Sequence, residues 1–171
     1  MSEWEQVDRV LPCLLDRLTF KKKGDDSSQA NSPFRVGGIT VREFRQAVLR
    51  DLRWLFNTPT HTPGEALYEF SEVADSVINF GTRDITGICL ADIDERSLEL
   101  ELKKSIIRFE PRIKPSSLSL KATKVKDTYS NSGNKIVLEL RGILNIPPVP
   151  DEISAKTEID LETGHFETTL L

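Results

Sequence analysis

The stretch IKPSSLSLKAT, residues 113–123, decides the fold, because the spacing of apolar residues changes along it from a helical to a strand period. Before it, a segment capped by Asp94 has apolar residues at every third or fourth position and is closed by Pro111. Beyond Pro115, apolar and polar residues alternate, as in a strand with one buried face. The alternating apolar residues are Leu118, Leu120 and Ala122. The chain therefore changes here from helices to strands.

Three more alternating runs follow and complete a predicted sheet of four strands. They cover residues 136–140, 153–161 and 166–170. The polar stretch KDTYSNSG, residues 126–133, predicts a turn between the first two strands. The prolines of NIPPVP, residues 145–150, cannot donate ladder hydrogen bonds, so this stretch predicts a rigid connection. A hairpin loop is expected before the last strand, with Gly164 in a left-handed conformation.

Helical patterns precede the strands. Thr40 and Glu43 have the spacing of a capping box and open a predicted helix that ends before Asn57. A shorter helix is expected over residues 71–80, with Gly81 as its C-terminal cap. Helices followed by antiparallel strands predict an α+β domain, in which the helices pack on one face of a mainly antiparallel four-stranded sheet.

The chain divides into three segments by composition. Residues 1–20 predict an N-terminal helical arm, in which a short helix begins near Pro12. Residues 21–38 contain almost no apolar side chains and predict a flexible linker. Residues 39–171 form the predicted α+β domain.

Composition excludes several classes of function. With 23 basic and 27 acidic residues the net charge is −4, which gives no electrostatic reason to expect nucleic acid or an anionic membrane as a partner. No apolar run reaches the roughly 20 residues that span a bilayer, and the N-terminus has no signal-peptide pattern. Cys13 and Cys89 are far apart and are expected to be buried thiols in a reducing cytoplasm. No phosphate-binding loop, zinc cluster or nucleophile elbow appears, so no cofactor or metal is expected. The many acidic residues leave open a pair of carboxylates that acts on a sugar bond, but solvated surface acids are the favoured interpretation, and no enzymatic activity is expected.

The stretch FEPRI, residues 109–113, is the most informative polar motif. Proline disfavours helical geometry in the preceding residue, so Glu110 is expected to leave the helix. In an extended segment Glu110 and Arg112 then project to the same side. A glutamate at a helix C-terminus faces the negative end of the dipole and needs a partner. Two interpretations stay open: Arg108 or Arg112 braces it locally, or the motif contacts another chain.

Four stretches together resemble a known family. They are FEPRI, LPCLLDRL at residues 11–18, VLRDLRWLFNT at residues 48–58 and SVINFGTRDITG at residues 76–87. In this order they are similar to the small baseplate wedge proteins of contractile injection machines, which include TssE of bacterial type VI secretion and its counterpart in contractile phage tails. The leucine-rich stretch at residues 11–18 favours type VI secretion.

The resemblance implies a structural role in the cytoplasm, in a baseplate that docks at the inner-membrane complex. The implied partners are TssF and TssG, a wedge that contains TssK, and the sheath subunits TssB and TssC. The implied fold is similar to the handshake region of the sheath subunit, so the edge of the sheet over residues 116–170 would accept sheath strands and nucleate sheath assembly. Glu110, Pro111 and Arg112 are the implied interface residues.

Members of this family have also been described as related to acidic lysozymes, which implies an alternative. Glu110 would then act as the general acid of a glycoside hydrolase that cleaves peptidoglycan. Its arginine neighbours Arg108 and Arg112 would favour the charged carboxylate instead, which argues against acid catalysis. An adaptor unrelated to secretion is a third possibility.

Overall fold

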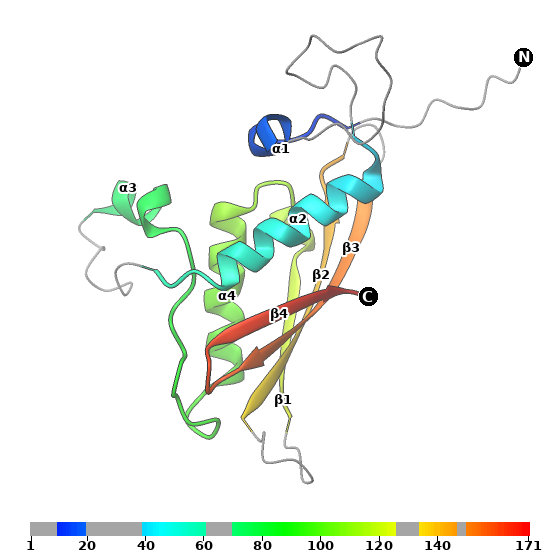
Figure 1. Ribbon diagram of the computed structural model, residues 1–171. Helices are drawn as coiled ribbons and strands as arrows, with labels where there is room; N and C mark the ends of the chain where they lie inside the picture. The colour runs from blue at the N-terminus through cyan, green and yellow to red at the C-terminus, as the bar shows by residue number, and fades with distance from the viewer. Residues whose placement is uncertain (1–9, 20–38, 61–69, 126–133, 147–149) are drawn as a thin grey trace, which may run out of the picture.

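The structure is a computed structural model that describes residues 10–19, 39–60, 70–125, 134–146 and 150–171. Helices precede strands along the chain, and a layer of helices lies against one sheet (Figure 1). The helices are α1 (Leu14–Thr19), α2 (Val41–Phe56), α3 (Ser71–Ala74), the short 3-10 helix η2 (Val77–Asn79), α4 (Glu95–Phe109) and the 3-10 helix η3 (Pro115–Ser117). The strands are β1 (Ser119–Val125), β2 (Lys135–Leu144), β3 (Asp151–Asp160) and β4 (His165–Leu170).

The four strands form an antiparallel sheet in the order β1-β2-β3-β4. In the register, Leu138 of β2 lies between Ala122 of β1 and Thr157 of β3, and all three are buried. Their neighbours along each strand face the opposite side and are exposed or half-buried. One face of the sheet is therefore the core face, which confirms the predicted α+β architecture and the change of period after Pro115.

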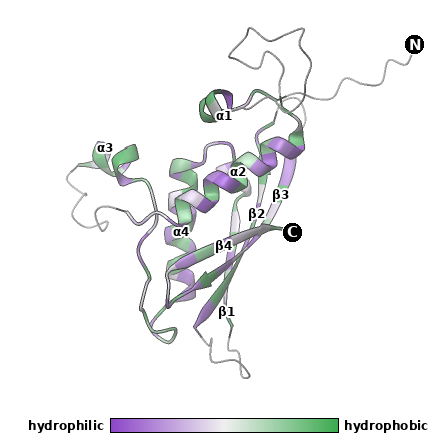
Figure 2. Ribbon diagram, viewed as in Figure 1, coloured by the Kyte–Doolittle hydropathy of each residue, from purple (hydrophilic) through white to green (hydrophobic). Residues whose placement is uncertain are grey.

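Both long helices cover this core face (Figure 1). α2 begins with the predicted capping box, since Glu43 N donates to Thr40 Oγ1 and Thr40 N donates to Glu43 Oε2. α4 begins at the predicted cap Asp94, which accepts a hydrogen bond from Ser97 N. Hydrophobic and hydrophilic positions alternate along both ribbons in Figure 2, as amphipathic helices require. Phe56 at the end of α2 stacks on a β4 phenylalanine and closes the core there.

The predicted helix over residues 71–80 is wrong. α3 has only four residues, and the chain continues as η2 before Gly81. Gly81 has φ +136°, and a Cβ built on it would lie 2.2 Å from the carbonyl oxygen of Thr58. Position 81 therefore requires glycine because the chain passes close to Thr58, and not because it caps a helix. Thr82 N donates a hydrogen bond to the same Thr58 carbonyl.

The expected burial of both thiols is also wrong. Cys13 is half-buried, and Cys89 is exposed in the loop before α4. α1 begins two residues after Pro12, as predicted, but its leucines stay largely exposed. The body of the fold contacts the segment before α1 through an antiparallel bridge between Val10 and Ile39. The predicted linker over residues 21–38 and the predicted turn over residues 126–133 lie outside the described residues.

Candidate functional site

Glu110 and Arg112 contact each other at the end of α4, within the chain. α4 ends at Phe109, and Glu110 has left the helix with φ −124° and ψ 74°, as the following proline favours. Arg112 Nε donates to Glu110 Oε1 at 2.6 Å, and Arg112 Nη2 donates to Glu110 Oε2. This fork confirms that the two side chains lie side by side. Arg108, the other candidate partner, pairs instead with Asp75.

This pair is one end of a row of alternating acids and arginines that joins α1, α2 and the turn after α4. Arg112 Nη2 also donates to Asp51 Oδ2 at 2.6 Å, and Arg50 Nε donates to Asp51 Oδ1 at 2.8 Å. Arg50 Nη1 in turn pairs with Asp16 of α1. We call Asp16, Arg50, Asp51, Arg112 and Glu110 the ion-pair chain. Each charge in it has an opposite neighbour.

The end of the ion-pair chain at Glu110 is buried, because only 3% of this residue is exposed. The side chain of Arg112 is 21% exposed, and its guanidinium lies 5.8 Å from the centre of the Phe44 ring. Burial by itself lowers the pKa of Arg112, but the carboxylates of Glu110 and Asp51 outweigh it and raise this pKa above its ordinary value. Arg112 is therefore held as a fixed cation.

The other end of the ion-pair chain attaches α1 to α2. Burial raises the pKa of Asp16, but hydrogen bonds from Arg50 and from the thiol of Cys13 outweigh this and hold the pKa below its ordinary value. The guanidinium of Arg50 also lies 4.9 Å from the centre of the Trp54 ring. Asp16 is therefore a stable anion that ties the short arm to the body of the fold.

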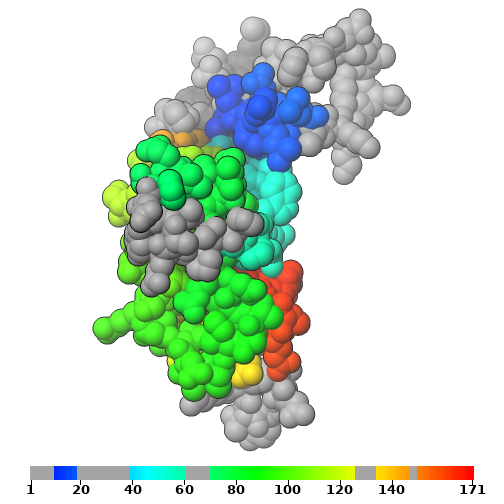
Figure 3. All heavy atoms as spheres, turned by 90° about the vertical axis from the view of Figure 1, so that its left-hand side faces the viewer, coloured from blue at the N-terminus to red at the C-terminus, as the bar shows by residue number. Residues whose placement is uncertain are grey.

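A hollow of about 210 Å³ opens beside the ion-pair chain. Besides Asp51, Glu110 and Arg112, its lining residues are Cys13, Leu15, Leu52, Trp54, Leu55, Phe80 and Phe109. In Figure 3, α1 in blue lies directly against α2 in cyan at this end of the molecule. The hollow therefore combines an apolar and aromatic wall with a charged wall. Pro111 is exposed next to it.

The geometry does not suit Glu110 to acid catalysis. Both of its carboxylate oxygens accept hydrogen bonds from Arg112, and a general acid must come within about 3 Å of the atom it protonates. Among the described residues, no cluster of three or more histidines, cysteines or carboxylates has a metal-binding arrangement. The helices that the structure describes are all too short or too polar to cross a membrane.

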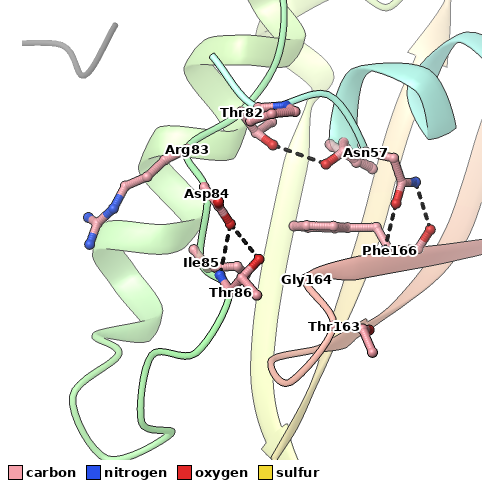
Figure 4. Close-up of a pocket in the computed structure, with 11 residues that line it drawn as sticks. Asn57, Thr82, Arg83, Asp84, Ile85, Thr86, Thr163, Gly164 and Phe166 are labelled. Carbon is pink, nitrogen blue, oxygen red and sulfur yellow. Dashed lines mark hydrogen bonds between the residues drawn. The ribbon is translucent and has the colours of Figure 1, made fainter. Parts of the chain in front are cut away.

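A second hollow of about 190 Å³ lies between the segment 82–86 and the hairpin that joins β3 to β4 (Figure 4). Asp84 Oδ1 accepts hydrogen bonds from the backbone and the hydroxyl of Thr86, and the side-chain bond is the larger cause of the lowered pKa of Asp84. Gly164 has φ +68°, as predicted, and a Cβ there would lie 2.2 Å from Thr86 Oγ1. The segment and the hairpin are thus closely packed.

Side chains from α2 cover the edge of the sheet at β4. Asn57 Oδ1 accepts from Phe166 N at 3.0 Å, and Asn57 Nδ2 donates to Phe166 O at 2.9 Å (Figure 4). The amide of Asn57 thus makes the pair of hydrogen bonds that a neighbouring strand would make. Arg53, one helical turn earlier, donates through both Nε and Nη2 to Thr168 O.

Side chains from α4 cover the other edge, at β1. Ala122 N donates to Glu99 Oε1 at 2.7 Å, and Lys124 N donates to Glu95 Oε1 at 3.1 Å. Four helical residues advance about 6 Å, and two strand residues advance about 6.6 Å, so the spacings match on both edges. The sequence did not predict which strands lie at the edges of the sheet, and the strand order places β1 and β4 there.

The family model described as "baseplate wedge protein gp25" matches residues 42–148, which is more than half of the chain. The chain belongs to the gp25 baseplate wedge family. This confirms the resemblance drawn from the sequence, because TssE-type proteins belong to the same family. Searches of curated proteins and of solved structures gave no significant match. Three of the four similar stretches lie inside the matched region, and the stretch at residues 11–18 lies outside it.

Parts of all four stretches that carry the gp25 resemblance lie around the ion-pair chain. Three of them supply the ion-pair chain: Asp16 comes from the first, Arg50 and Asp51 from the second, and Glu110 and Arg112 from FEPRI. The fourth stretch packs beside them, with ring centres of Phe80 and Phe109 5.3 Å apart. Of these residues, only those of FEPRI were predicted from the sequence, although the acid–arginine pairs in the stretches at residues 11–18 and 48–58 were a usable signal.

Proposed function

We propose that this protein is a structural baseplate subunit of a type VI secretion machine. In this role it joins the wedge complex to the first sheath ring and nucleates sheath assembly. The observation that carries the proposal is membership of the gp25 baseplate wedge family over residues 42–148. The choice of type VI secretion rests on the resemblance at residues 11–18, and the contact of Asp16 with Arg50 ties that segment to the matched region. The protein would work in the cytoplasm.

The proposed contact with TssF, TssG and the TssK-containing wedge lies around the ion-pair chain. Glu110 is buried, so within this interface it would act by holding Arg112 in position. Pro111, Trp54 and the partly exposed Arg112 would touch the partner, because they reach the surface beside the apolar hollow. Tryptophan and arginine next to a hollow are the residue types that most often dominate interface energetics.

The proposed contact with the sheath subunits TssB and TssC is strand addition at an edge of the sheet. Side chains cover both edges at least in part in this structure, as Asn57 does at β4 and Glu99 does at β1. Strand addition would therefore exchange these side-chain hydrogen bonds for main-chain ones. Before assembly, the side-chain hydrogen bonds would keep the edges from pairing with other strands.

Co-expression followed by affinity capture tests the proposal. The tagged protein is expected to capture TssF–TssG and, separately, TssB–TssC. Trp54→Ala is expected to weaken capture of TssF–TssG about tenfold, because truncation of a central interface tryptophan costs at least about 1.4 kcal/mol. Val125→Ala changes another exposed apolar residue, far from the ion-pair chain, and is the matched control, which should capture TssF–TssG as the unaltered protein does. Failure of the unaltered protein to capture either complex would contradict the proposal.

A further inference from the structure

The edge of the sheet at β1 is only half satisfied. The amides of Ala122 and Lys124 point away from β2, because they donate to Glu99 and Glu95. In an antiparallel ladder the carbonyl of a residue points the same way as its amide, so the carbonyls of Leu120, Ala122 and Lys124 also face outward. Within the described residues no donor to these carbonyls is found. Side-chain carboxylates can cover only the amides, and a strand is needed to satisfy both kinds of group.

A hollow of about 250 Å³ runs alongside this edge, between α4 and the start of β1. Leu100 is 55% exposed on its helical wall, and Leu118 and Leu120 form its strand wall. Arg96 and Lys103 line the same hollow. Arg96, Leu100 and Lys103 are spaced i, i+4 and i+7, so they form one stripe of α4 with a cation on either side of an apolar residue.

None of the salt bridges within the described part of the chain involves Arg96 or Lys103. Along an extended chain, a side chain is repeated on the same face at every second residue. Two acids that flank an apolar residue on one face are about 13 Å apart, while Arg96 and Lys103 are about 10.5 Å apart along the helix axis. Their long side chains bridge the difference.

We propose that the β1 edge and its adjoining hollow bind an extended segment of a partner chain as an added strand. The segment has the pattern acid-x-apolar-x-acid on the face that meets α4. Its main chain pairs with residues 120–124, its apolar side chain enters the hollow beside Leu100, and its acids pair with Arg96 and Lys103. The inference deepens the proposed sheath contact and rests on that proposed function only for the identity of the partner.

Glu99 can leave the edge without losing a charged neighbour. Lys103 lies four residues after it on α4, which is the favourable order for a glutamate–lysine pair on a helix. Both residues line the same hollow. An incoming carbonyl that replaces Glu99 as the acceptor of Ala122 N leaves this carboxylate within reach of Lys103, which would then lie between Glu99 and an acid of the added segment. The β4 edge differs, because Asn57 satisfies both the amide and the carbonyl of Phe166.

A titration monitored by NMR tests the inference on the full chain. The probe is the capped peptide Thr-Glu-Thr-Leu-Thr-Glu-Thr, and the matched control replaces both of its glutamates with lysine. The acidic peptide is expected to shift the amide signals of Leu120, Ala122 and Lys124 saturably. The signals of Phe166 and Thr168 at the other edge should not move. The lysine peptide should bind at least about tenfold more weakly, because it places like charges beside Arg96 and Lys103.

Two variants distinguish the contribution of main-chain strand pairing to peptide binding from that of the charge contacts. Lys124→Pro removes an outward-facing amide without breaking a ladder bond to β2, and should abolish binding of both peptides. The double variant Arg96→Glu/Lys103→Glu reverses the charge of two residues that line the hollow and should reverse the preference, so that the lysine peptide binds better. Shifts confined to β4, or no saturable shift with either peptide, would overturn the inference. The capture experiment would still test the baseplate proposal, because it does not depend on which edge accepts a strand.

Discussion

Removal of Arg112 should destabilise the fold far more than removal of a similar surface arginine. Glu110 is only 3% exposed in the structure, and in Arg112→Ala its carboxylate loses its cation. Breaking a buried ion pair from one side costs about 3–5 kcal/mol. Arg112 and Asp51 are 21% and 23% exposed, so water screens part of the loss and we expect about 3 kcal/mol, the lower end of that range.

Urea unfolding followed by far-ultraviolet circular dichroism measures this loss. With a slope of about 2 kcal/mol per molar urea, the midpoint for Arg112→Ala should fall by about 1.5 M. Arg45→Ala is the matched control, because Arg45 also donates two hydrogen bonds of 2.6 Å to one aspartate, Asp151, but is 39% exposed. Its loss should stay below about 1 kcal/mol.

Removal of the Glu110 charge should partly rescue Arg112→Ala. Glu110→Gln in the Arg112→Ala background removes the unpaired buried charge, so the double variant should be more stable than Arg112→Ala alone. The account of Glu110 as a buried, braced carboxylate would be refuted by either of two results. One is a midpoint for Arg112→Ala no lower than that of Arg45→Ala. The other is a double variant that is less stable than the single variant.

Two further predictions concern the backbone and pH. Gly81→Ala should lower the free energy of unfolding by about 3 kcal/mol, because the new Cβ would clash with the Thr58 carbonyl. Gly87→Ala is the control: Gly87 has φ +75°, but no atom lies within 4 Å of its added Cβ, so the loss should be only about 1 kcal/mol. Equal losses in urea unfolding would contradict this. The hydrogen bond from Arg45 holds the pKa of Asp151 below its ordinary value, so its contribution to stability is present above about pH 4 and is lost as pH falls through the folded pKa. Unfolding free energies measured from pH 5 to pH 2.5 should therefore fall less steeply in Arg45→Ala than in the unaltered protein, and parallel curves would argue against the assignment.

The long helices and the strands were predictable because their signals are local. The capping box at Thr40 and the cap at Asp94 are set by residues three apart, and strand alternation is visible within a few positions. The prediction of a helix over residues 71–80 was wrong because the interactions that shape this segment are not local. Its fold depends on Gly81 passing close to Thr58, 23 positions earlier, and the exposed Val77 and Ile78 form no apolar stripe against the core.

The site divides in the same way. Contact between Glu110 and Arg112 was predictable because an extended segment brings residues two apart to one side. The contact of Arg112 with Asp51 spans 61 residues, and that of Arg50 with Asp16 spans 34. Hydrophobic periodicity does not predict contacts between residues so far apart in the sequence. It indicates which face of a helix is buried, but not which helices contact each other. The interface role of Glu110, Pro111 and Arg112 stays a prediction.

The ion-pair chain is better suited to fixing geometry than to adding stability. A buried ion pair contributes little more than well-packed apolar residues would, because desolvation offsets most of its attraction. Its five members come from three segments, and they set how α1 meets α2 and how the chain leaves α4. We infer as a hypothesis that the chain is an alignment device for the proposed wedge contact. Replacing Arg112 and Glu110 together by methionine and leucine tests this: the protein should keep its melting temperature within a few degrees and still lose capture of TssF–TssG. Retained capture would mean that apolar packing aligns these segments equally well.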